Sequence, residues 1–175
     1  MPKATTFLIL TVIGNDRPGL VGELAATISK HDGNWLESSM SHLAGQFAGI
    51  VKVAVPQARV QTLQDALAGL AGLKVTCVSS AGDAPAKGRR LKLALVGHDR
   101  IGIVREVSLV LASHAVNVEE LATYTSSAPM SAETLFHANA ELLAGANIDT
   151  RALTAALEQI SNDLMVDITL DEALK

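Results

Sequence analysis

The chain has 175 residues, of which 49% are hydrophobic, 18% charged and 3% aromatic, so it can bury an aliphatic core and intrinsic disorder is excluded. Its formal net charge of −4 at pH 7 gives no broad positive field for phosphates, which disfavours direct nucleic-acid binding. No apolar run reaches the roughly 20 residues of a membrane helix, and residues 1–4 lack the layout of a signal peptide. We therefore expect a cytoplasmic protein without membrane contact.

The first half of the chain predicts six elements, in the order strand, helix, strand, strand, helix, strand. Runs of β-branched and aliphatic residues predict the strands, and apolar residues at helical spacing predict the helices. A short turn between two strand-like runs predicts a hairpin in the middle. The expected strands are 4–13, 35–43, 47–55 and 73–79, and the expected helices are 18–31 and about 60–70.

The second half predicts the same order after a small, polar, Gly/Pro-containing stretch at 81–88, which is typical of a linker. We therefore expect two domains, 1–80 and 89–175. The expected strands of the second domain are 91–96, 116–125, 133–142 and 164–170, and its expected helices are 101–114 and about 149–161.

The two halves also share sequence. Residues 14–37 and 97–120 are identical at nine of 24 positions: Gly, Asp, Arg, Gly, Val, Glu, His, Asn and Glu. Shared core patterning would match apolar class rather than these polar identities, so the repeat indicates a duplicated domain. Each copy predicts an α+β, ferredoxin-like βαββαβ domain, an antiparallel four-stranded sheet with two helices on one face.

The turn "GNDRPG" at 14–19 joins a strand to a helix N-terminus, where unpaired amides and the helix dipole favour a carboxylate. Gly14 and Gly19 are expected to leave room for a ligand, Pro18 to begin the helix, and Asp16 to cap it. Alternatively, Asp16 is only a cap and Arg17 only a surface residue. The second half repeats the turn with Gly97, Asp99, Arg100 and Gly102, with Ile101 in the place of Pro18.

A free amino acid carries both a carboxylate, which such a helix start can bind, and an ammonium group, which needs oxygen acceptors. The candidate acceptors are the Asn and Asp side chains of the repeated segment. A structural role as a helix stop is an equal alternative for Asn34 and Asn117, which follow the helices. The candidates are Asn15, Asp16 and Asn34 in the first domain and Asp99 and Asn117 in the second.

These residues carry a resemblance. The stretch "NDRPGLVGELAATISKHDGNW" resembles the opening of an ACT domain, a small amino-acid-sensing module of the same element order. Two such domains in tandem, without an attached enzyme, resemble the glycine cleavage system transcriptional repressor family. The hairpin "TYTSSAPMSAETLF" at 123–136 is similar to the second domain of that family.

The resemblance implies that an effector binds at the interface between two such units, through the loop before the first helix. The ligand-binding residues that it implies are Asn15, Asp16, Gly19, Leu20 and Val21, and His98, Asp99, Gly102, Ile103 and Val104. Because Ile101 departs from the proline form, the second loop is either structural or binds something different. Glycine or serine is the expected effector.

No catalytic constellation, nucleotide-binding loop, cofactor motif or close-spaced metal ligands are recognisable, so no enzyme and no cofactor are expected. His31 and His114 fall at equivalent helix ends, where a cation complements the dipole. The preferred function is a sensor that acts through a protein partner such as a transcription factor, and a homodimer is possible. The alternatives are a separate regulatory subunit of an amino-acid metabolic enzyme and, as a third option, a hidden catalytic activity.

Overall fold

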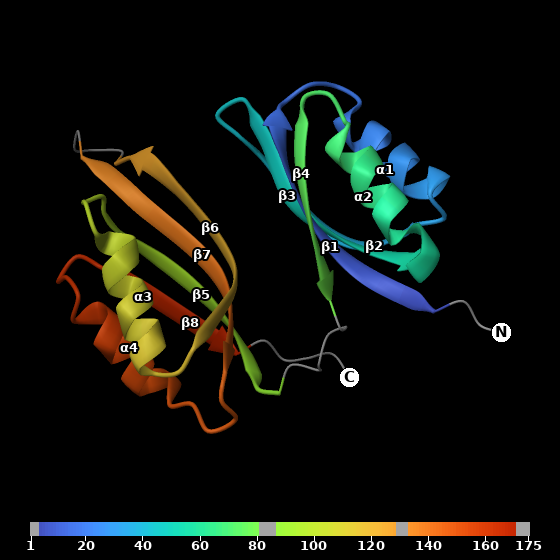
Figure 1. The fold of residues 1–175 in the computed structure, drawn as a ribbon. Coiled ribbons are helices and arrows are strands. Elements are labelled where there is room, and N and C mark those ends of the chain that lie inside the picture. Colours follow the sequence, from blue (N-terminus) through green and yellow to red (C-terminus); the bar gives the residue numbers. More distant parts are fainter. Residues whose placement is uncertain (1–3, 81–86, 129–132, 171–175) are drawn as a thin grey trace. The chain divides into compact units, whose positions relative to one another are not determined.

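The computed structural model describes residues 4–80, 87–128 and 133–170 of the chain. It divides into two compact units, Met1–Ala84 and Pro85–Lys175, called here the first and second unit. Figure 1 shows that each unit is a sheet with two helices against one of its faces. The units are described separately below.

The first unit has the predicted order of elements, and its sheet order is β2-β3-β1-β4 with antiparallel pairs. A short 3-10 turn, η1, leads into its second helix. The elements are β1 (Thr5–Asn15), α1 (Leu20–Lys30), β2 (Asn34–Leu43), β3 (Gln46–Pro56), η1 (Gln57–Arg59), α2 (Val60–Ala68) and β4 (Leu73–Ser80).

The second unit repeats this topology, with the sheet order β6-β7-β5-β8. Every neighbouring pair is again antiparallel. The ferredoxin-like α+β fold predicted from the sequence is therefore confirmed for both units. The elements are β5 (Arg89–His98), α3 (Ile103–Ser113), β6 (Asn117–Ser127), β7 (Thr134–Ala144), α4 (Thr150–Glu158) and β8 (Met165–Leu170).

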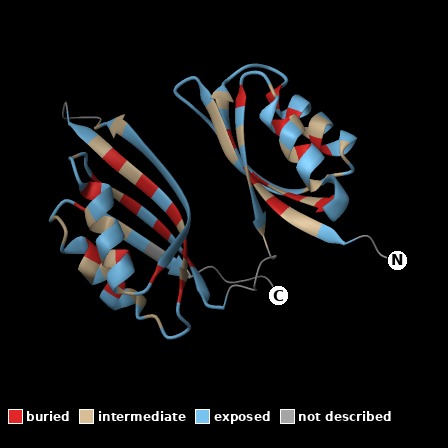
Figure 2. Ribbon diagram, viewed as in Figure 1, coloured by how far each residue is buried: buried red, intermediate tan, exposed pale blue. Residues whose placement is uncertain are grey.

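The core of each unit lies between the sheet and its helices. From Leu8 to Val12 on β1 every second residue is buried, because side chains alternate between the two faces of a strand. The helices meet this face with one apolar stripe each, which Figure 2 shows as buried segments on their inner sides. The first unit's buried residues include Leu8, Leu10 and Val12 from β1, Leu20, Leu24 and Ile28 from α1, and Leu63 and Leu67 from α2.

The first helix of each unit, α1 or α3, starts two residues later than predicted from the sequence. Gly19 and Gly102 adopt φ of +94°, a left-handed conformation, and are the N-caps of α1 and α3. A left-handed residue cannot lie inside a right-handed helix, so Pro18 and Ile101 belong to the preceding turn. The prediction that Pro18 begins the helix is therefore wrong.

Some sequence predictions fall outside the described residues. These are residues 81–86 of the expected linker and Pro129, Met130 and Ser131 of the hairpin motif. Within the described ranges, no helix is long and apolar enough to cross a membrane.

Candidate functional site

The loop between β1 and α1 is tied to the β2–β3 turn. The backbone amide of Asp16 donates to the carbonyl of Gly45 at 2.9 Å. The side-chain amide of Gln46 donates to Oδ1 of Asn15 at 2.7 Å. The two loops at this end of the sheet therefore support each other, and the acceptor oxygen expected on Asn15 already has a partner.

The start of α1 has no side-chain cap. The first intrahelical hydrogen bond joins the Glu23 amide to the Gly19 carbonyl at 2.9 Å, so the amides of Leu20 and Val21 precede the helical ladder. Val21 is 46% exposed, which leaves this end of the helix accessible.

Helix α4 of the second unit begins differently. Its N-cap residue Asp149 accepts hydrogen bonds from the amides of Arg151 and Ala152, at 3.0 and 3.1 Å. A carboxylate of the chain thus accepts from the first amides of α4, whereas at α1 the first-turn carboxylate, Glu23, pairs with Arg17 and no side chain caps the helix.

Arg17 and Glu23 form an ion pair that was not predicted from the sequence. Nη1 and Nη2 of Arg17 donate to the two carboxylate oxygens of Glu23 at 2.6 and 2.7 Å. These hydrogen bonds lower the pKa of Glu23 below its ordinary value and raise that of Arg17. Arg17 is therefore not a lone surface charge, because its charge is paired within the loop. The repetition of both residues in the second half was the signal for this pair.

Asp16 does not cap α1, because Gly19 is the N-cap and no side chain fills that role. The prediction of an aspartate cap, and the alternative that Asp16 is only a cap, are both wrong. Oδ2 of Asp16 lies 3.6 Å from Nε2 of His42 on β2, and both side chains are about half exposed. The Asp16 carboxylate is thus accessible at the mouth of the loop.

Gly14 lets two strands of its own sheet pack closely, and this contact rather than room for a ligand explains the glycine. A Cβ at Gly14 would lie 2.1 Å from the carbonyl oxygen of Gly72, at the start of β4. In the second unit, a Cβ at Gly97 would lie 2.7 Å from Cδ1 of Leu164. Both glycines therefore allow a close approach within their own sheet, and the expectation that Gly14 leaves room for a ligand is wrong.

The second unit builds the same loop. The Asp99 amide donates to the carbonyl of Thr134 at 2.9 Å, and the Glu106 amide to that of Gly102 at 3.0 Å. Arg100 donates from Nη1 to Glu106 at 3.0 Å and pairs with it a second time through Nη2. No side chain caps α3; the amide of the buried Ile103 donates to the carbonyl of Arg100 at 3.4 Å, and the next amide belongs to Val104, which is exposed.

His98 distinguishes the second loop from the first. Its ring nitrogens lie 3.0 Å from a carboxylate oxygen of Glu133 and 3.0 Å from one of Asp163. Its backbone amide also donates to Asp163 at 2.8 Å. A hydrogen bond from the Ser161 hydroxyl and this amide bond lower the pKa of Asp163 to about 2. His98 is therefore engaged by groups of its own unit, whereas its counterpart Asn15 contacts a neutral glutamine.

Asn34 and Asn117 lie away from these loops. Asn34 pairs with Ala54 on β3, whereas Asn15 pairs with Gln46, eight positions earlier on the same strand. At about 3.3 Å per residue this separates them by about 26 Å, too far for one small ligand within the unit. The left-handed residue after α1 is Asp32 rather than Asn34. The helix-stop alternative is therefore wrong for Asn34.

The same arrangement holds for Asn117 in the second unit. Asn117 pairs with Leu143 and His98 with Leu135, again eight positions apart on one strand. The left-handed residue after α3 is Ala115, so Asn117 is not the helix stop either. The structure thus brings together the loop candidates of each unit and leaves the two asparagines at the opposite end of the sheet.

The helix-end histidines have the structural role expected for them. His31 and His114 are the C-caps of α1 and α3, and Nδ1 of each lies 2.9 and 3.0 Å from the carbonyls of Thr27 and Val110, respectively. Among residues 4–80, 87–128 and 133–170, no group of three His, Cys, Asp or Glu side chains could hold a metal ion.

Comparisons with known proteins agree with this fold. Residues 6–75 match the family model of the ACT domain. An unknown protein from Galdieria sulphuraria has a similar structure, with a TM-score of 0.84, 27% identity, and coverage of 96% of this chain and 99% of that one. No curated protein sequence matches the chain significantly.

The fold of the whole chain also resembles the crystal structure of a proposed glycine cleavage system transcriptional repressor. The TM-score is 0.69 at 17% identity, and the match covers 95% of this chain and 98% of that one. At this identity the likeness concerns the fold. Residues 6–75 of the first unit are thus similar to the ACT domain, and the same ferredoxin-like fold is repeated in the second unit.

Proposed function

We propose that the chain is a regulatory protein that binds a small amino acid at the loop between β1 and α1. The observation that carries this proposal is the start of α1, where a left-handed glycine is followed by two amides that no side chain caps. At α4 the equivalent place is filled by Asp149. A carboxylate from a ligand matches the uncapped helix end.

The loop also offers an acceptor for the ammonium group of a zwitterionic amino acid. The ligand carboxylate would accept from the amides of Leu20 and Val21, and its ammonium group would donate to the carboxylate of Asp16. Asp16 is suited to this because its amide is fixed to Gly45 while its side chain is about half exposed. In the second unit, Asp99, Gly102, Ile103 and Val104 would take the corresponding places, beside a His98 that is already paired.

Glycine or serine is the ligand that we propose for this site. The fold shared with the proposed glycine cleavage system transcriptional repressor supports a role in regulating glycine metabolism. The net charge of −4 favours action through a protein partner, such as a transcription factor, rather than direct contact with DNA. If the ligand favours one conformation of the protein by a few kcal/mol, its binding changes the surface that the partner protein contacts.

Titration calorimetry of the full chain with the twenty standard amino acids tests the proposal. We expect saturable heat with glycine or serine, and loss of that heat in Asp16→Ala. Asp65→Ala is the matched control, since it removes the same charge from an exposed position on α2 and leaves the loop intact. The absence of binding heat with all twenty amino acids, or equal binding by Asp16→Ala and the wild type, would overturn the proposed site.

Affinity purification from native lysate, with and without glycine, tests the regulatory step. Recovery of a transcription factor in a glycine-dependent manner supports the repressor role. Recovery of an amino-acid metabolic enzyme instead supports a separate regulatory subunit, and tight, salt-sensitive binding of the purified chain to DNA contradicts the indirect mechanism.

A further inference from the structure

Three ionisable side chains meet at the end of the second sheet where β5 leads into α3. Nε2 of His98 lies 3.0 Å from Oε2 of Glu133, the residue before β7. Nδ1 of His98 lies 3.0 Å from Oδ2 of Asp163, in the turn between α4 and β8. One imidazole thus joins three segments that are distant in the chain. We call these three residues the His98 cluster.

The first unit has no ionisable side chain at the matching positions. The register of β1 on β3 repeats that of β5 on β7, so residues two positions before each paired strand end correspond. The turn before β4 corresponds to the turn before β8, because the leucine that follows each turn lies beside the matching glycine of β1 or β5. The counterparts of His98, Glu133 and Asp163 are Asn15, Ala44 and Gly72, respectively.

The contacts of His98 match a protonated ring. Both ring nitrogens face carboxylate oxygens, and an ionised carboxylate only accepts hydrogen bonds. A neutral imidazole has one N–H, so it can donate to Glu133 or to Asp163 but not to both. A protonated imidazole has two N–H groups and can donate to both. Its positive charge also balances part of the negative charge of the two carboxylates.

Asp163 remains an anion over the range in which histidine titrates. Hydrogen bonds from the Ser161 hydroxyl and from the backbone amide of His98, the latter at 2.8 Å, hold its pKa at about 2. Arg100 also acts on Asp163 electrostatically, and Arg100 is itself hydrogen-bonded to Glu106 of α3. His98 is therefore the group whose charge changes next to Asp163 near neutral pH.

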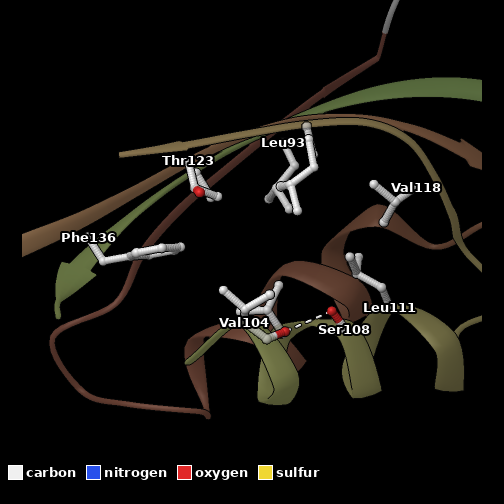
Figure 3. A pocket seen from close by; sticks show the side chains of 11 residues that line it. Leu93, Val104, Ser108, Leu111, Val118, Thr123 and Phe136 are labelled. Atoms are coloured by element: carbon white, nitrogen blue, oxygen red, sulfur yellow. Dashed lines mark hydrogen bonds between the residues drawn. The ribbon is translucent and has the colours of Figure 1, made fainter. Parts of the chain in front are cut away.

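The His98 cluster adjoins the start of α3. His98 follows Gly97, which pairs with Phe136 on β7. Figure 3 shows Phe136 and Val104, the second residue of α3, on either side of the space between the sheet and the helix. The backbone amide of Asp99 also donates to the first carbonyl of β7 at 2.9 Å. The loop between β5 and α3 is therefore held by β7 on one side and by the His98 cluster on the other.

We propose that the His98 cluster is a proton-dependent contact that fixes the β5–α3 loop of the second unit. The contact is complete while His98 is protonated. When the ring loses a proton, one carboxylate faces a nitrogen without hydrogen, and the contact weakens. The first unit does not respond in this way, because Asn15 and its neighbours cannot change charge. The proposal does not depend on the amino-acid site at the β1–α1 loop.

The pH range of the effect follows from the ordinary titration of the side chains. Exposed glutamate titrates near pH 4.3 and histidine near pH 6.5 in an unfolded chain. Contacts of a protonated histidine stabilise the folded state below the histidine's titration and are lost as the pH rises through it. The loop should therefore be held most firmly at about pH 5.5 and less firmly at pH 8.

Amide hydrogen exchange of the full chain at pH 5.5 and pH 8, followed by NMR and corrected for intrinsic exchange, tests the proposal. The amides of His98 and Asp99 report on the loop, and the amide of Asp16, which donates to Gly45, is the matched reference in the first unit. We expect about two- to tenfold higher protection of the two reporters at pH 5.5, the size that two exposed ion pairs supply, and no such change at Asp16. Equal protection of the reporters at both pH values would overturn the proposal.

Two variants assign the effect to the cluster. His98→Asn copies the first unit and should abolish the pH dependence of the Asp99 amide. Asp163→Asn should reduce it, because a carboxamide can donate to a neutral ring nitrogen. His114→Asn is the matched control, since His114 lies at the other end of α3, next to the carbonyl of Val110, and should keep the pH dependence. PH dependence that persists in His98→Asn, with a well-dispersed spectrum, would contradict the assignment.

Discussion

Arg17 holds Glu23 through two hydrogen bonds of 2.6 and 2.7 Å, on either side of the left-handed Gly19 that begins α1. Arg100 and Glu106 make the same pair around Gly102 in the second unit. The pair holds the guanidinium against the carboxylate of the first helical turn, so its charge is balanced within the loop. The pair thereby leaves recognition of a carboxylate to the backbone amides.

The first prediction concerns the titration of Glu23. Its pKa is lowered by the hydrogen bond from Arg17, so Arg17→Gln should return it towards its ordinary value. A depressed folded-state pKa gives a stabilisation that is present above the unfolded pKa, at about 4.3, and is lost as the pH falls through the folded value. The wild type should therefore lose this stabilisation in acid, and Arg17→Gln should lack it.

Carboxyl ¹³C NMR measures this titration. Glu106 provides the internal control, because its pKa is lowered by Arg100 in the second unit and should not change in Arg17→Gln. An unchanged pKa of Glu23 in the variant would show that the ion pair does not persist in solution.

The second prediction concerns Gly19. Gly19→Ala should destabilise the first unit by about 1–2 kcal/mol, because an alanine Cβ is strained in the left-handed region. Gly22→Ala is the matched control, since Gly22 lies within α1 and a Cβ there meets nothing within 4 Å. It should stabilise the unit by about 0.5–1 kcal/mol.

Amide hydrogen exchange in α1 and β1 measures both effects on the first unit alone. Equal stability of the two alanine variants would argue against the left-handed start of α1. Loss of amino-acid binding in Gly19→Ala, with binding intact in Gly22→Ala, would add support to the loop site.

The third prediction compares one core position in the two units. Leu24→Ala should cost about 2–5 kcal/mol, because Leu24 is fully buried in a continuous core. Val107→Ala should cost only about 1 kcal/mol, because it removes less apolar surface and this side chain is only half-buried in the structure. Hydrogen exchange in α1 and α3, respectively, separates the two effects. Similar costs would mean that the second core is packed as tightly as the first.

The order and type of the elements are predictable from the sequence because they depend on residues that are close to one another along the chain. Alternating apolar residues mark the strands, and apolar stripes mark the helices, over stretches of about ten residues. The errors lie at the turns. Pro18 was placed inside α1, yet the helix begins after the left-handed Gly19, and proline and glycine signals at such turns locate a boundary only to within a few residues.

The candidate site was predicted only in part. The two glycine-bearing loops are located by the repeat, which also repeats Arg17 and Glu23, but only the coordinates show that these two side chains meet. The role of Gly14 depends on the carbonyl of Gly72, and the position of Asn34 depends on the register of β2 on β3. These contacts join residues that are distant in the chain, so no local pattern contains them.

The sequence by itself determined that one βαββαβ domain was built twice, because periodicity and polar identities recur at a constant offset. Only the tertiary structure decided that the two copies differ inside. Trp35 and Met40 pack against the core of the first unit, whereas Val118 and Thr123, at the same positions of the repeat, are exposed beside α3. The physical reason is that a cavity depends on the summed volume of side chains from several elements, which becomes defined only when the sheet and helix pack together.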